Sequence, residues 1–240
     1  MNLSASRAWR TVAVLALVGC GFDDAEPTRI SVRVPQMAYS LDTADGKRWK
    51  TPPGGVPAVG CGQDDVPGCC RPDSDATLDC QAYALACEME TCVLTLTTEL
   101  VLPINLGKDA PELGGLAGRQ VSGVVLKAIT YKAQSSLDVD VPSVDLYVAP
   151  KAIESRMSQD AKKLGTVPAI RAGATVPEGE IVLAPGGAAA FQLLAKNYTA
   201  PFNVIAATSP KIGGDVPAPV GRLDLWIGGR AEFEVLPATK

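Results

Sequence analysis

The chain has 240 residues, enough for one large domain or two small ones, and 47% of them are hydrophobic, which is ample for a core. It carries 22 basic and 26 acidic side chains, and this mildly acidic balance argues against nucleic acid as a partner, because nucleic acid requires basic patches. Histidine is absent, which excludes Ser-His-Asp and Cys-His catalysis and histidine-ligated metals.

Residues 1–19 have the features of a secretory signal peptide. Arg7 and Arg10 precede an uncharged apolar run over residues 12–18. This run is too short to cross a bilayer, which takes about 20 apolar residues. Removal of residues 1–19 takes away both arginines and no acid, so the net charge of −4 becomes −6. The run ends in Leu17-Val18-Gly19-Cys20, an aliphatic residue, a tolerant position, a small residue and a cysteine.

This tetrad resembles the lipobox of bacterial lipoproteins. In that family diacylglycerol is attached to the cysteine thiol, a peptidase cuts before the cysteine, and the new amine is often acylated. The resemblance implies a covalent lipid with palmitate-type chains on Cys20 and an address in the cell envelope, because two or three acyl chains hold a protein to a membrane where one does not. The alternative is an ordinary secretory signal that ends near a cysteine by chance.

The residue after the cysteine is Gly21. In enteric lipoproteins an aspartate at this position retains the protein in the inner membrane, so the resemblance implies the outer membrane. The mature part also resembles cysteine-containing envelope lipoproteins of gliding and predatory soil bacteria. Those proteins look like β-sandwiches behind a short tether.

The mature chain is predicted to consist of a tether and one domain. Residues 20–29 form a short acidic tether, and residues 30–240 form a single β-rich domain with a disulfide-rich insertion at 61–92. Alternating apolar residues predict a first strand over 29–34. Clusters of Asp, Gly and Pro predict a loop over 35–60.

Six cysteines remain besides Cys20, all of them within 61–92. An even number outside the cytoplasm predicts three disulfides. Six cysteines allow 15 pairings; a bridge between adjacent cysteines is strained, so we do not expect the two neighbours to pair with each other. A zinc or cluster site is the weaker alternative, because paired CxxC spacings and histidine are absent. The six are Cys61, Cys69, Cys70, Cys80, Cys87 and Cys92.

No cofactor is predicted apart from the lipid. The cysteine region contains five aspartates between residues 64 and 79, and oxygen-rich loops can bind Ca²⁺. The spacing of an EF-hand is absent, so acidic exposed turns are the simpler interpretation and calcium is the alternative.

Beyond Cys92, short apolar runs separated by turn signals predict strands at 93–106, 120–132, 137–148, 180–184, 202–208 and 222–236. Apolar residues spaced about four apart predict a helix over 150–164, a second short helix is expected over 187–197, and one or two helical turns over 76–89. Many short strands, sparse helices and 19 prolines favour a mainly β fold, an antiparallel β-sandwich with Greek-key connections.

No catalytic residues are predicted, since motifs such as GxSxG and SxxK are absent. Asp138 and Asp140 lie on the polar side of an alternating run and are expected to be solvated. Trp49, in a Lys-Arg-Trp-Lys run within the predicted loop, is the candidate for an exposed ligand contact, because exposed tryptophans can stack on sugar rings. Trp226 lies in an apolar strand and is expected in the core or at a sheet edge.

These features together predict a lipid-anchored, non-enzymatic envelope lipoprotein. It would act as a binding or scaffold module for another envelope protein or a surface polymer. The loop over 35–60 and the cysteine region are expected to carry the contacts, because long loops commonly carry function. The alternatives are a glycan-binding surface adhesin that uses Trp49 or Trp226 and, with less support, a hydrolase of envelope polymers.

Overall fold

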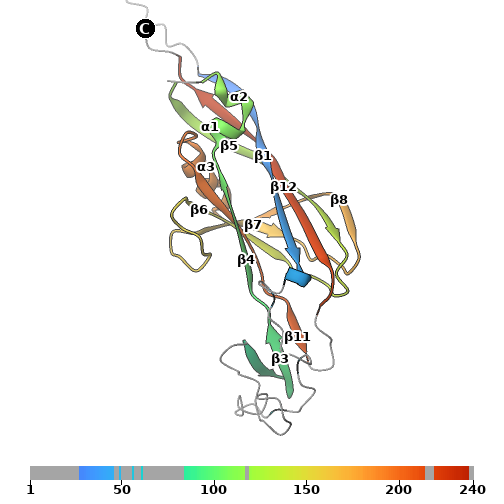
Figure 1. Cartoon of the computed structure of the whole chain (residues 1–240). Coiled ribbons are helices and arrows are strands. Elements are labelled where there is room, and N and C mark those ends of the chain that lie inside the picture. Colours follow the sequence, from blue (N-terminus) through green and yellow to red (C-terminus); the bar gives the residue numbers. More distant parts are fainter. Residues whose placement is uncertain are drawn as a thin grey trace, which may run out of the picture.

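The computed structural model describes residues 27–45, 49, 56, 61, 84–116, 119–213 and 219–237. Within these ranges the chain is mainly β, with three antiparallel sheets and a few short helices (Figure 1). The predicted antiparallel β-sandwich is therefore confirmed. The signal peptide, Cys20 and the tether up to residue 26 lie outside the described residues.

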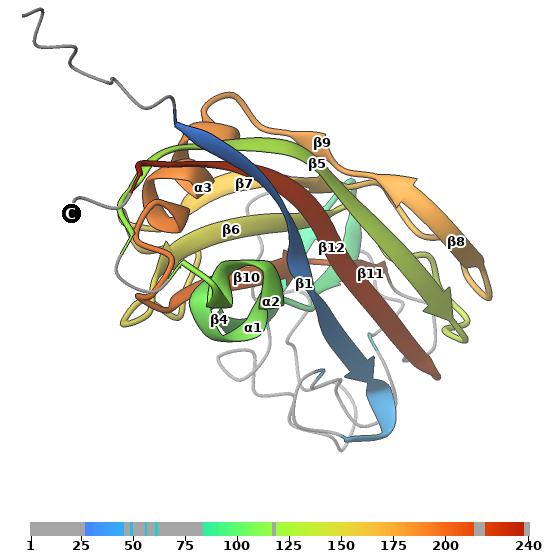
Figure 2. The same ribbon diagram turned by 90° about the horizontal axis from the view of Figure 1, so that it is seen from above.

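Two of the sheets face each other and form the sandwich (Figure 2). The four-stranded sheet contains, in spatial order, β1 (Thr28–Asp42), β12 (Arg222–Val235), β5 (Val121–Ser135) and β8 (Thr175–Glu180). The five-stranded sheet contains β4 (Thr98–Ile104), β10 (Phe202–Thr208), β6 (Val144–Pro150), β7 (Lys162–Val167) and β9 (Val182–Leu183). The chain crosses between the two sheets repeatedly, as in going from β4 to β5 and back to β6.

A third, three-stranded sheet lies at the end of the molecule away from the start of β1 and the end of β12 (Figure 1). It contains β11 (Lys211–Gly213), β3 (Thr91–Thr95) and β2 (Leu85–Glu88). The turn between β2 and β3 consists of Met89 and Glu90, both at positive φ (48° and 62°), the backbone that a two-residue hairpin turn requires. The helical turns predicted over 76–89 are thus wrong for residues 85–88.

The two-residue period of the long strands separates the core from the solvent. Along β12, Leu223, Leu225 and Ile227 are buried, whereas Asp224 and Trp226 point to the other side. Strands β1 and β5 alternate in the same way. Burial of one large apolar side chain contributes about 1.5–3 kcal/mol, so this alternation determines which face of the four-stranded sheet meets the second sheet.

Strand β10 is buried at every position, and its Asn203 contacts the segment over 151–160. Asn203 Nδ2 donates hydrogen bonds to the carbonyls of Lys151 (2.8 Å) and Ile153 (2.9 Å). Arg156 pairs with Glu99 of β4 at 3.2 Å. The helix predicted over 150–164 is therefore wrong: two carbonyls that it would use accept from Asn203 instead, and the chain forms turns up to β7.

Other element boundaries also differ from the prediction. Strand β1 begins inside the predicted tether and runs to Asp42, followed by the 3-10 helix η1 (Thr43–Asp45), so the loop predicted from residue 35 is wrong for residues 35–45. The run over 93–106 forms two strands, β3 and β4, rather than one. Of the run over 137–148, only the part from Val144 is a strand.

Short helices close the end of the sandwich at which β1 begins and β12 ends (Figure 1). Leu106 of α1 (Leu106–Asp109) and Leu113 of α2 (Pro111–Gly114) are buried. The helix predicted over 187–197 is confirmed as α3 (Gly187–Ala195), and its Phe191 packs edge-on against Phe202 with ring centroids 5.9 Å apart. None of the described helices has the length and apolar character needed to cross a membrane.

Candidate functional site

The described part of the cysteine region is held by disulfides, as predicted. Cys61 and Cys87 are bonded, with their Cα atoms 5.9 Å apart, and Cys92 is also disulfide-bonded. Cys69, Cys70 and Cys80 lie outside the described residues, as do the aspartates considered for calcium. Among the described residues, no group of three or more His, Cys, Asp or Glu side chains could hold a metal ion.

Trp49 is buried, and its prediction as an exposed ligand contact is wrong. Its side chain is only 5% exposed, and its indole Nε1 donates a 2.6 Å hydrogen bond to Oγ1 of Thr98. The indole has a large apolar surface and one polar atom. Burial removes the apolar surface from water, and the hydroxyl of Thr98 on β4 accepts the hydrogen bond of the polar atom. Trp49 is therefore a core residue despite the charged side chains next to it in the sequence.

Trp226 lies on the side of β12 that faces away from the five-stranded sheet, and it is partly exposed. Its neighbours in the ladder are Ala38 of β1 and Lys132 of β5, both exposed. A small residue on one side and a solvated lysine on the other leave the indole accessible. Of the two tryptophans considered from the sequence, Trp226 rather than Trp49 can contact a ligand.

Trp226 belongs to a larger open surface, the solvent-facing side of the four-stranded sheet, named here the outer face. Arg230 follows Trp226 on β12 by four positions, which corresponds to about 13 Å along a strand. The side chains of Arg33, Arg230, Lys132, Glu178 and Glu180 are exposed on or beside this surface. By contrast, the outward side of β10 in the other sheet is buried.

Two glycines lie between Trp226 and Arg230 and have different roles. A Cβ atom at Gly228 would have nothing within 4 Å, so this position is open. A Cβ atom at Gly229 would lie 2.5 Å from the carbonyl oxygen of Ala128. The neighbouring strand therefore requires a glycine at 229, whereas the glycine at 228 leaves a gap on the outer face.

A groove of about 490 Å³ lies on the outer face beside this gap. Arg33 and Arg230 line one part of it, Glu178 and Glu180 of β8 another, and Thr130 of β5 lies between them. The groove thus offers cationic donors and anionic acceptors on a shallow surface. Such a surface suits an extended polar ligand better than an enclosed small molecule.

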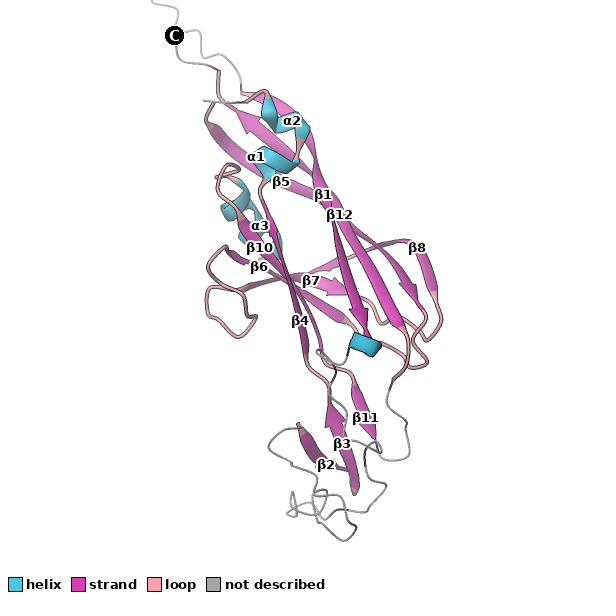
Figure 3. Cartoon of the chain, in the orientation of Figure 1, coloured by secondary structure: helices cyan, strands magenta, loops and turns pink. Residues whose placement is uncertain are grey.

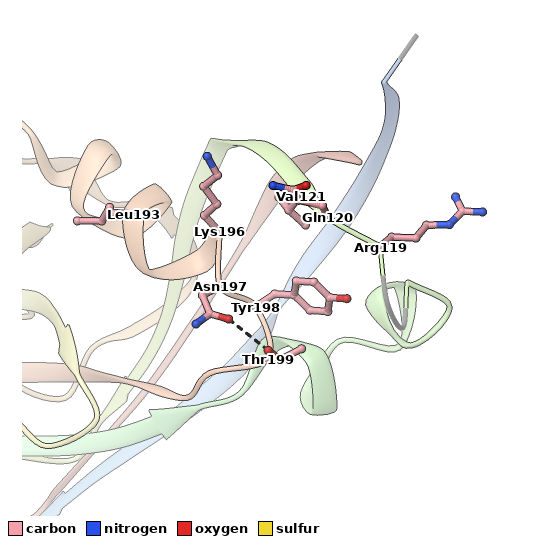
Figure 4. A pocket seen from close by; sticks show the side chains of 8 residues that line it. All are labelled: Arg119, Gln120, Val121, Leu193, Lys196, Asn197, Tyr198 and Thr199. Atoms are coloured by element: carbon pink, nitrogen blue, oxygen red, sulfur yellow. Dashed lines mark hydrogen bonds between the residues drawn. The ribbon is translucent and has the colours of Figure 1, made fainter. Parts of the chain in front are cut away.

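A second hollow, of about 600 Å³, lies at the end of α3 (Figure 4). Two of its hydroxyl groups already have partners: Tyr198 Oη donates to the carbonyl of Leu116 (2.8 Å), and Thr199 Oγ1 donates to Asn197 Oδ1 (3.2 Å). Figure 4 shows that Arg119 and Lys196 extend in different directions. This hollow offers fewer converging groups than the groove on the outer face.

A small void of about 20 Å³ lies beside Tyr39 in the interior between the two sheets. That volume is close to the minimum for one water molecule, so it cannot accept a substrate. Tyr39 is buried, its hydroxyl donates to the carbonyl of Val204 (3.2 Å), and burial raises its pKa well above the ordinary value. Tyr39 is therefore part of the core and not a solvent-accessible acid or base.

Asp138 and Asp140 are exposed, as predicted, but they lie in the loop after β5 instead of on a strand. Each accepts a 2.8 Å hydrogen bond from a backbone N–H, Asp138 from Val220 and Asp140 from Ala172. Both carboxylates thus order neighbouring loops.

No family model matches this chain, and no curated protein sequence matches it. Among solved structures, a chain of turnip yellow mosaic virus is 8% identical and covers 100% of this chain and 93% of its own, with a TM-score of 0.30. A chain of Desmodium yellow mottle tymovirus is 10% identical, with coverages of 100% and 96% and a TM-score of 0.26.

A structure from work on the promiscuous specificity of carbohydrate-binding modules of the β-sandwich superfamily is 8% identical to this chain. The match covers 87% of this chain and 57% of that chain, with a TM-score of 0.28. Similarities of this size carry no information about function.

Proposed function

We propose that the protein is a lipid-anchored, non-enzymatic binding module of the bacterial cell envelope and that its ligand is a surface polysaccharide bound on the outer face. The observation that carries this proposal is the position of Trp226, an accessible indole on a sheet surface that also presents charged hydrogen-bonding side chains. An aromatic ring packs against the C–H face of a sugar ring. The charged neighbours can bind its hydroxyl groups.

The lipid anchor is supported by the Leu17-Val18-Gly19-Cys20 tetrad. Strand β1 begins at Thr28, eight residues after Cys20. A fully extended chain of that length spans at most about 30 Å. A lipid on Cys20 would therefore keep the end at which β1 begins near the bilayer, with the outer face running along the side of the molecule.

A non-enzymatic role is supported by the chemistry of the side chains. The sequence has no histidine, and the carboxylates of Asp138 and Asp140 order loops. The buried Tyr39 hydroxyl is bonded within the core. The alternative of a polymer hydrolase has no comparable cluster of residues in its favour within the described ranges.

The test is binding of the full-length protein, in mild detergent, to polysaccharides immobilised on an array. Trp226→Ala should weaken binding by at least tenfold, because a central aromatic contact of this kind is worth about 2 kcal/mol or more. Tyr147→Ala is the matched control: Tyr147 is a partly exposed aromatic residue of β6 in the other sheet. An equal loss in both variants, or no loss in Trp226→Ala, would contradict the proposal.

A further inference from the structure

Two arginines lie side by side on neighbouring strands of the outer face. Arg33 of β1 is directly opposite Arg230 of β12 in the antiparallel ladder, and both side chains are exposed. Side chains in such a pair have Cβ atoms about 4.5–5.5 Å apart, and like charges there are destabilising. The pair therefore concentrates positive charge at one place on an acidic protein.

The acidic residues further along β12 already have partners. Glu232 pairs with Lys127 at 2.8 Å, and Glu234 pairs with Arg29 at 3.0 Å. Within the described ranges, neither Arg33 nor Arg230 forms an ion pair. Among the residues that the structure describes, no carboxylate therefore pairs with these two adjacent guanidinium groups.

The backbone around the pair keeps both guanidinium groups open to a ligand. On the same side of β12 as Arg230, Gly228 has no side chain, and a Cβ atom there would have nothing within 4 Å. The register between β1 and β12 shifts between Val34 and Met37. The ladder between β12 and β5 also shifts, at Arg230/Ala231. Irregularities of this kind increase the local twist and re-aim side chains, and the groove of about 490 Å³ lies here.

We propose that the Arg33–Arg230 pair binds a carboxylate of the polysaccharide, so that the ligand is an acidic, uronate-type glycan; this inference rests on the proposed function of the outer face. Guanidinium groups bind carboxylates through two parallel N–H···O bonds. Trp226, about 13 Å further along β12, would contact a neighbouring part of the same chain of sugars.

The rest of the groove favours a carboxylate over a phosphate. Glu178 and Glu180 line the β8 side of the groove and, within the described ranges, have no ion-pair partner. A group with a single negative charge is repelled by them less than a phosphate monoester, which carries a charge of about −1.5 to −2 at neutral pH. The two glutamates can accept hydrogen bonds from sugar hydroxyl groups.

The test measures binding of the full-length protein, in mild detergent, to alginate, polygalacturonate and hyaluronate and to the carboxyl-reduced form of each. Phosphorylated mannan is the phosphate probe. The variants are Arg33→Gln, Arg230→Gln and the double variant, and Arg119→Gln, an exposed arginine beside the hollow at α3, is the control. Thermal unfolding is recorded for every variant.

The expected result is at least tenfold tighter binding to one acidic polymer than to its reduced form. This preference should disappear in the double variant, remain in Arg119→Gln, and weaken with added NaCl, which screens the charges. The unfolding midpoint of the double variant should stay unchanged or rise, because a like-charge repulsion is removed.

Three results would overturn the inference. Equal binding to acidic and reduced polymers that still depends on Trp226 would remove the acidic specificity and leave the proposed function standing. Tighter binding to phosphorylated mannan than to the acidic polymers, lost in the double variant, would show that the arginine pair binds phosphate instead of a carboxylate. Absence of binding to every polymer would overturn the inference and the proposed function together.

Discussion

Trp49 and Trp226 have the same side chain but lie in opposite environments. Trp49 is buried and bonded to Thr98, whereas Trp226 faces solvent on the outer face. Trp49→Ala should destabilise the protein by about 3–5 kcal/mol, the usual cost of removing a buried tryptophan. Trp226→Ala should change stability by less than about 1 kcal/mol and reduce binding instead. Urea unfolding of both variants checks this, and equal midpoints would contradict the assignment of Trp49 to the core.

Both tryptophans lie in environments other than those predicted from the sequence, for different physical reasons. Trp49 is surrounded by lysine and arginine, yet its hydrogen-bond partner, Thr98, is 49 residues away, and no local pattern can reveal that contact. Trp226 lies in a strand whose alternation is plain, with Leu225 and Ile227 beside it. That alternation places Trp226 on the opposite side from these leucine and isoleucine side chains, a signal that was present in the sequence and favoured the solvent face.

Tyr39 gives a prediction about pH. Burial raises its pKa above the ordinary tyrosine value of about 10. A group whose pKa is raised on folding contributes full stability below the unfolded pKa, and this contribution is lost as the pH rises towards the folded value. The free energy of unfolding should therefore fall above pH ~10, by up to about 1.4 kcal/mol per pH unit from this residue.

Tyr39→Phe should remove this contribution. Its stability at neutral pH should be lower by about 1 kcal/mol, because the hydrogen bond to Val204 is lost. Its decline above pH ~10 should be shallower than that of the wild type. Urea unfolding at several pH values between 8 and 11.5 measures both slopes, and identical slopes would show that Tyr39 does not cause the alkaline loss.

At the scale of elements, alanine substitutions at the two adjacent glycines of β12 should have opposite effects on stability. Gly228→Ala should be neutral or stabilising by up to about 1 kcal/mol, because the site is open and a glycine in a strand costs entropy. Gly229→Ala should destabilise by about 1–3 kcal/mol, because its Cβ would collide with the carbonyl of Ala128. Thermal unfolding distinguishes the two, and equal midpoints would contradict the close approach of β5 at Gly229.

Period-two alternation predicted most strands. Helical spacing of apolar residues, by contrast, gave a wrong prediction for the segment over 151–160. Ile153, Met157 and Ala161 have helical spacing, but Met157 is 81% exposed and the carbonyl of Ile153 accepts from Asn203. A polar side chain on a distant strand therefore determines the path of this segment. Local spacing holds no information about such a partner, whereas α3, which packs through its own apolar residues, was predictable.

At the scale of the whole molecule, the start of β1 and the end of β12 lie at one end and the disulfide-bonded sheet at the other (Figure 3). If Cys20 carries the lipid, Cys20→Ala should move the protein from the membrane fraction to the soluble fraction, and the acyl mass should disappear from the N-terminal peptide. Retention of the variant in the membrane fraction would contradict anchoring through Cys20. Co-purification from membranes in mild detergent, with the same variant as control, would also reveal a protein partner.

The sequence predicted the disulfide bonds and the β-sandwich, which the structure has, but it did not predict the outer face that we propose as the binding surface. The outer face combines Arg33, Trp226 and Glu180 from three strands, and it exists only once the register between those strands is established. Function was expected in the loop over 35–60 and in the cysteine region. Strand β1 occupies the first part of that loop, and its exposed residues contribute to the outer face instead.

Hydroxyl-radical footprinting tests the central claim most directly. The full-length protein is oxidised in isolated envelopes and again after purification in mild detergent, and the modification of each side chain is compared by mass spectrometry. We predict that Trp226 is protected in the envelope, whereas Met157 and Met89, which are 81% and 93% exposed and lie away from the outer face, are modified equally in both. Protection of Met89 with Trp226 unchanged would contradict the account and move the binding surface to the disulfide-bonded end.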